Sequence, residues 1–177
     1  KFFDKVFGKA AVQAGGMLAD QVTLWRAMRV VELRARFDRF VKARGLDYTD
    51  LRPLSLGQAL PLIDAASMEE SSEVQDLWAA LLANTMDATS GVSYKKVYVG
   101  LLKELGSAEA MLLDGIWRLR KTVQERAKEP VLEVLPDLIS VMSAKWRTLS
   151  VGDQASAISN LRRLGLLMPD LTMPNLN

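Results

Sequence analysis

The spacing of apolar residues along the chain predicts an all-α protein. The longest periodic stretch covers residues 17–44, about 40 Å of helix at 1.5 Å per residue, and Gly45 is placed to end it. Its apolar residues follow two lines on the predicted helix: Leu18, Val22, Trp25, Leu33, Phe37 and Phe40 on one, and Met17, Leu24, Met28 and Val31 on the other. Two apolar lines require packing partners on two sides. We therefore expect this helix to contact a partner, and we predict self-association.

Shorter amphipathic stretches predict further helices on both sides of a polar turn at 87–93. They cover residues 55–66, 68–86, 94–105, 107–128, 131–146 and 152–164. Ser67 and Glu70 have the spacing of a capping box for the helix 68–86. Each of the four tryptophans lies among apolar neighbours, which is typical of core anchors. We divide the chain into an N-terminal region 1–92 and a C-terminal region 93–177, and expect the two to form one compact unit.

The C-terminal region has the order of elements found at the end of a winged helix. A short linker leads into the helix 152–164, Gly165 ends it, and a short β element is expected at 166–173. In a winged helix the last helix enters the major groove of DNA, where Arg162 and Arg163 could contact phosphates. The same shape also serves in protein interactions, so a winged-helix-type DNA-binding module is one alternative.

Charge is distributed in three blocks that the overall net of +2 conceals. Residues 1–50 have a net charge of +4, residues 51–92 of −5, and residues 93–177 of +3. The basic face of the long helix includes Arg26, Arg29 and Arg36, which could bind nucleic acid. The simpler interpretation, which we favour, pairs this face with the acidic middle block inside the fold.

The chain contains no cysteine and no histidine, which excludes several kinds of chemistry. Disulfides, thiolate nucleophiles, Ser-His-Asp triads and ordinary zinc sites all require one of these residues. Phosphate-binding glycine loops and nucleophile elbows are also missing from the sequence. Carboxylates are left, and a Mg²⁺-dependent nuclease could be built on Glu69, Glu70 and Glu73 with Asp64, although helix capping and solvation explain them. We expect no enzyme activity, no cofactor and no small-molecule substrate.

Residues 1–14 form a short amphipathic segment with Phe2, Phe3 and Phe7 on one side and lysines elsewhere. Such a segment could dock on a protein partner or lie on a membrane, so a membrane-active effector is a second alternative. No apolar run approaches the roughly 18 residues of a membrane helix. We expect a cytoplasmic protein, with membrane association through residues 1–14 left open. Because the chain begins with Lys1, we also expect it to be a fragment of a longer protein.

Three stretches together resemble the abortive infection alpha family. They are AAVQAGGMLADQVTLWRAMRV (10–30), LPLIDAASMEESSEVQDLWAALLANTMD (60–87) and AISNLRRLGLL (157–167). The resemblance implies a bacterial protein with a role in defence against phage, and it supplies no catalytic residues. Many abortive-infection toxins are helical RNases that use an Arg-x4-His motif. Because this chain lacks histidine, that catalytic mechanism is excluded. We therefore expect a non-enzymatic component of an anti-phage system that acts through protein–protein contacts, with residues 17–44 and 1–14 as its surfaces.

Overall fold

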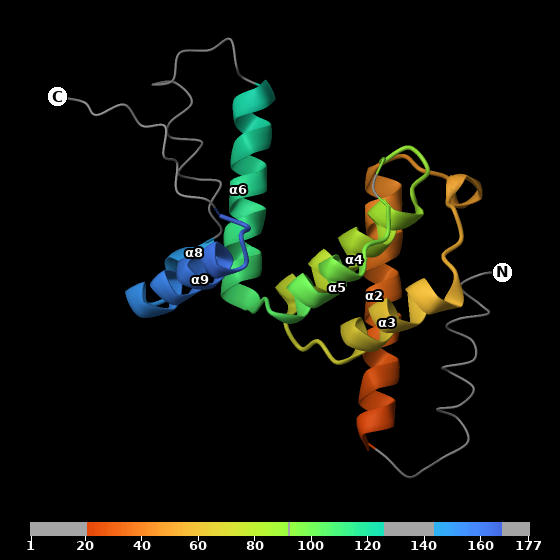
Figure 1. Cartoon of the computed structure of the whole chain (residues 1–177), viewed down its shortest axis with the longest axis horizontal. Coiled ribbons are helices and arrows are strands. Elements are labelled where there is room, and N and C mark those ends of the chain that lie inside the picture. Colours follow the sequence, from red (N-terminus) through yellow and green to blue (C-terminus); the bar gives the residue numbers. More distant parts are fainter. Residues whose placement is uncertain (1–20, 92, 126–143, 168–177) are drawn as a thin grey trace. The chain divides into compact units, whose positions relative to one another are not determined.

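The computed structural model describes residues 21–91, 93–125 and 144–167, and within these ranges the protein is all-helical without a strand (Figure 1). The elements are, in order, α2 Gln21–Ala43, the 3-10 helix η1 Tyr48–Asp50, α3 Leu56–Ser67, α4 Ser72–Met86, α5 Lys96–Lys103, α6 Ser107–Glu125, α8 Ala144–Arg147 and α9 Val151–Arg163. The chain forms two compact units, residues 1–104 and 105–177. The all-α prediction is confirmed for the described residues.

Helix α2 is the longest element of the N-terminal unit, and α3 and α4 pack against it (Figure 1). The side chains of Leu33 and Phe37 are completely buried at this contact. From the other side, α3 contributes Leu62 and α4 contributes Trp78, and neither is more than 1% exposed. One apolar line of the long helix therefore forms the centre of this core.

Glycine ends α2 as the sequence predicts. Gly45 has φ +65°, a left-handed conformation that other residues rarely adopt. The N–H of Gly45 donates to the Lys42 carbonyl at 3.0 Å and that of Leu46 to the Val41 carbonyl at 3.1 Å. These two hydrogen bonds are the Schellman motif, which satisfies carbonyls that the helix end would otherwise leave unpaired.

The capping box predicted at Ser67 is wrong. Helix α3 continues through Ser67, whose side chain is buried and donates to the Asp64 carbonyl at 2.7 Å. Arg26 of α2 also donates to the Ser67 hydroxyl, at 3.2 Å. With this hydroxyl committed to α3 and α2, the cap of α4 is Ser71, whose hydroxyl accepts the Val74 N–H at 3.2 Å.

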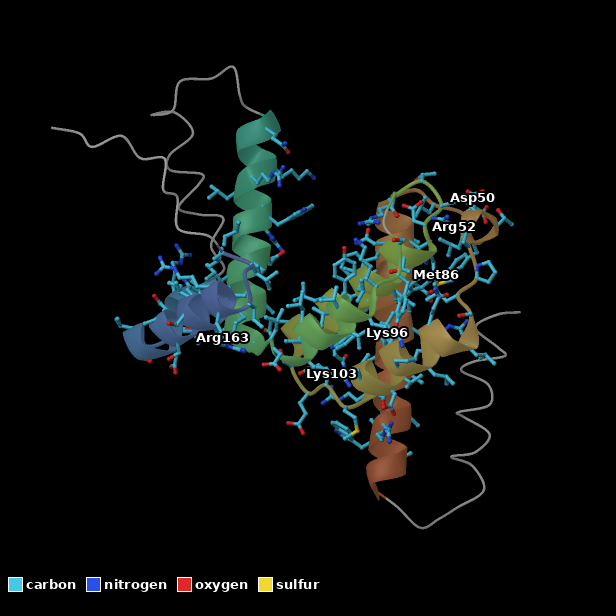
Figure 2. The ribbon with its side chains drawn as sticks, viewed as in Figure 1. Asp50, Arg52, Met86, Lys96, Lys103 and Arg163 are labelled. Carbon is cyan, nitrogen blue, oxygen red and sulfur yellow. The ribbon has the colours of Figure 1, made fainter. Side chains whose placement is uncertain are left out.

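A short contact between distant segments connects the end of α4 to the loop after η1. The N–H of Arg52 donates to the Met86 carbonyl at 2.7 Å, and Figure 2 shows these two residues side by side. Leu51 and Asp87 form an isolated antiparallel bridge at the same place. This contact fixes the loop against α4 without forming a sheet.

Helix α5 belongs to the N-terminal unit, although the sequence-based boundary at residue 92 assigns it to the C-terminal region. Val99 of α5 is only 7% exposed, because α5 packs against α3 and α4. The contacts therefore place the division after Glu104. That the two regions form one compact unit stays a prediction.

The C-terminal unit is built on α6, against which α8 and α9 pack. Among its buried residues are Ala110, Met111 and Leu112 of α6, Trp146 of α8, and Ala157 and Leu161 of α9. The predicted helix 131–146 falls mostly outside the described residues, which include only its end as α8.

The winged-helix-like ending expected for this unit is not found in its described residues, 105–125 and 144–167. After α9 the chain turns at Gly165, which has φ +70°. The N–H groups of Leu166 and Leu167 both donate to the Leu161 carbonyl, at 2.9 and 3.2 Å. These residues therefore close the helix end instead of starting a strand, and residues 168–173 of the expected β element lie outside the described ranges.

Candidate protein-interaction surface on helix α2

Helix α2 carries a line of apolar side chains on the face opposite its buried one. Leu24, Met28 and Val31 are 63%, 57% and 67% exposed. Ala35, one turn further along, is exposed as well. Because residues three and four apart lie on the same face of a helix, these four form one continuous strip, which we call the outer stripe.

The outer stripe coincides with the second apolar line that the sequence predicts for this helix. The first line contains Leu33 and Phe37, which are buried, and Trp25 and Phe40, which are half-buried. Periodicity alone showed two apolar faces, but it could not show which face the rest of the fold would cover. Leu18 and Met17, one from each line, lie outside the described residues.

Arginines flank the buried face of α2 and pair with carboxylates of the acidic block. Arg36 donates to Asp76 of α4 at 2.6 Å, and Arg26 forms an ion pair with Asp64 of α3. Arg44 lies 3.8 Å from the buried carboxylate of Asp87. These pairs support the interpretation that the basic and acidic blocks neutralise each other within the fold.

Asp87 organises the end of α4 through a second set of contacts. Its carboxylate accepts the hydroxyl and the backbone N–H of Thr89, each at 2.7 Å. These two hydrogen bonds, helped by the charge of Arg44, hold the pKa of Asp87 below its usual value. Asp87 is therefore a buried, ionised link between the ends of α2 and α4.

The five candidate nucleic-acid contacts are split between the two units. Arg26 and Arg36 are paired as described, and Arg29 donates to Glu32 at 2.9 Å while stacking 5.3 Å from the centre of the Trp25 ring. Arg162 and Arg163 lie at the exposed end of α9. Arg163 donates to the Asn160 side chain at 2.8 Å. Nucleic-acid contact by these residues stays a prediction. A phosphate would have to compete with the carboxylate partners of the three arginines on α2.

Within the described residues, the remaining candidates give no second site. Phe2, Phe3 and Phe7, predicted to contact a membrane or partner, lie outside the described residues. Glu69 accepts the Ser71 N–H at 2.7 Å and Glu73 accepts the Ser71 hydroxyl at 3.1 Å, so both serve the start of α4. In the described part of the chain no group of three or more acidic side chains could hold a metal ion.

Sequence reasoning missed a cleft of about 510 Å³ that is lined by the start of α6, by Thr148 and Leu149 before α9, and by α9. Its acidic residues are Glu109 and Asp153. Glu109 accepts the Gly106 N–H at 3.0 Å and the Asn160 side-chain amide at 2.9 Å. Asp153 accepts the Ser150 hydroxyl at 2.7 Å. Both carboxylates thus stabilise the helix starts beside the cleft.

These observations define a class: an all-helical protein whose most distinctive surface is an exposed apolar face on its longest helix. None of the helices in the described ranges has the length and apolar character needed to cross a lipid bilayer. The family model for abortive infection alpha matches residues 27–175, so the chain belongs to that family. No curated protein and no solved structure gave a significant match. The resemblance seen in the sequence is confirmed, and it associates the protein with abortive infection, a form of antiviral defence.

Proposed function

We propose that the protein is a non-enzymatic component of a bacterial abortive-infection system and that it acts through protein–protein contacts made by the outer stripe. One observation carries the proposal. Leu24, Met28 and Val31 lie exposed on one side of the same helix whose other side forms the core. A contiguous exposed apolar strip with charged neighbours is typical of an interaction surface.

Burial of the outer stripe would release a useful amount of free energy. A fully buried Val, Leu or Met side chain contributes about 1.5–3 kcal/mol relative to an exposed one. Because 57–67% of each of the three large side chains is still exposed, covering them would contribute about 4 kcal/mol in total. Association entropy reduces this sum, so we expect a reversible contact unless the partner covers neighbouring residues too.

The ion pairs of α2 favour a protein partner over nucleic acid. Phosphate binding would have to compete with Asp64 for Arg26 and with Asp76 for Arg36. Release of the mostly buried Arg36 side chain would cost its charged hydrogen bond to Asp76, which opposes phosphate binding. The apolar strip, in contrast, is available without any rearrangement of these contacts.

Val31→Glu tests the proposal, with Val97→Glu as the matched control. Val97 is 58% exposed on α5, so the control introduces the same charge at a similarly exposed valine of the same unit. In bacteria that carry the complete defence locus, we expect Val31→Glu to abolish protection in a phage plating assay and Val97→Glu to retain it. Circular dichroism must show that both variants keep the wild-type helix content. Full protection by Val31→Glu would overturn the proposal.

A further inference from the structure

The outer stripe has the spacing of a coiled-coil seam. Leu24, Met28, Val31 and Ala35 are separated by four, three and four residues, which is the alternation of a and d positions in a heptad. The next position of this series is Asp38, whose carboxylate accepts the Tyr48 hydroxyl at 2.6 Å. The apolar seam therefore ends at Ala35 and offers a second helix a short, defined contact.

We infer that the outer stripe binds the outer stripe of a second copy of this chain, with the two α2 helices antiparallel. This inference rests on the proposed function and specifies its partner. We infer the antiparallel orientation from the charged residues beside the seam. They would repel each other in a parallel pair but not in an antiparallel one.

A parallel pair would bring like charges together. In a parallel coiled coil the g residue of one helix faces the e residue of the next heptad on the other, which would place Arg34 opposite Arg39 of the second copy. Both arginines are exposed, and Arg39 is 69% so. The same orientation would align Asp38 with Asp38 of the second copy in one layer. Each of these contacts is repulsive, and the first occurs twice by symmetry.

An antiparallel pair avoids both repulsions. Met28 would pack against Val31 of the second copy, and Leu24 against Ala35, so that a large side chain meets a small one at each end of the seam. On one flank Arg34 would face the small Ala27. On the other flank Glu32, which pairs with Arg29 of its own chain, would also face Trp25 and the stacked Arg29 guanidinium of the second copy. The antiparallel register thus combines size matching with charge complementarity.

Disulfide trapping tests this geometry with little background, because the chain has no cysteine of its own. Leu24→Cys and Ala35→Cys are prepared as separate full-length proteins, mixed, and oxidised gently. In the antiparallel register these two positions face each other. Two copies of the same position would be about 16 Å apart along the helix axis, beyond the roughly 7 Å limit for a disulfide.

The expected result is a cross-linked heterodimer in the mixture, identified by its mass, with little cross-link from either variant alone. Val97→Cys, an exposed position on α5, measures random collision. Efficient cross-linking of Ala35→Cys with itself would overturn the antiparallel orientation. A strictly monomeric wild-type protein in sedimentation velocity at high micromolar concentration, without cross-linking, would overturn self-association.

These outcomes separate this inference from the proposed function. If the wild-type protein is a monomer and the Val31→Glu variant loses phage protection, the inferred dimer is wrong. The proposed function then holds, with a different protein as the partner. In the opposite case, disulfide trapping would show the antiparallel dimer, and the Val31→Glu variant would be monomeric but fully protective. The inferred dimer would then be correct, and its proposed role in defence would be wrong.

Discussion

Arg36→Ala tests whether the arginines of α2 serve the fold. The Arg36 side chain is only 15% exposed and donates to the Asp76 carboxylate at 2.6 Å. It also donates to the carbonyl and the hydroxyl of Ser72, each at 3.2 Å. A hydrogen bond that involves a charged group contributes about 1.5–3 kcal/mol, and the 48% exposure of Asp76 reduces that value through solvent screening. We expect Arg36→Ala to lower the free energy of unfolding by about 2 kcal/mol.

Arg39→Ala is the matched control for this substitution. Arg39 lies on the same helix and approaches the same carboxylate, but at 3.7 Å and with 69% of its side chain exposed. Exposed pairs of this kind contribute little, so we expect a loss below about 0.5 kcal/mol. Urea unfolding followed by circular dichroism measures both variants. A double-mutant cycle with Asp76→Ala isolates the Arg36–Asp76 coupling.

Equal stabilities of the two variants would refute the reasoning. Arg36 would then not be held by α4, and its guanidinium would be available to an external anion. In that case the nucleic-acid interpretation of the α2 arginines would gain support, and binding to DNA should weaken steeply as salt is raised.

Four further substitutions test the backbone and the titrating groups. Gly45→Ala should destabilise by about 1 kcal/mol, because its φ of +65° is left-handed, whereas Gly100→Ala inside α5 should stabilise by up to about 1 kcal/mol; urea unfolding decides the sign of each. Because the pKa of Asp87 is lowered, its contribution to stability is present above pH 3.8 and is lost as the pH falls below that value. The melting temperature of Asp87→Asn should therefore fall less steeply with decreasing pH than that of the wild type. Partial burial and the hydrogen bond to Asp38 raise the pKa of Tyr48 to about 12, so its contribution to stability is present below pH 10 and is lost as the pH rises through 12. In an ultraviolet titration, Tyr48→Phe should remove the absorbance change of a tyrosine that ionises near pH 12.

The helix ends that depend on a single residue were predictable from the sequence. Gly45 and Gly165 adopt the left-handed conformation that glycine tolerates best, so the ends of α2 and α9 fall where expected. Ser67 was misjudged because its hydroxyl is drawn into contacts with Asp64 and with Arg26 of α2. A contact between residues 41 positions apart is set by tertiary packing, which local spacing cannot show.

The same distinction applies to the candidate site. Helical periodicity made the second apolar line of α2 visible in the sequence, including Met28 and Val31. That this line stays exposed follows from α3 and α4 both packing on the opposite face. The β element expected after Gly165 was wrong for Leu166 and Leu167, because both N–H groups close the end of α9.

The outer stripe and the buried face of α2 lie on opposite sides of one helix, which has a consequence for how the protein can change. Leu33 and Phe37 are fully buried, so substitutions there would be limited by the loss of stability. Met28 and Val31 lie only a turn or two away but contribute little to the core. Mutations in the outer stripe would therefore change the strength or specificity of the binding proposed for it while the fold stays intact. Such a division leaves a defence protein free to adjust its contacts without first being rebuilt.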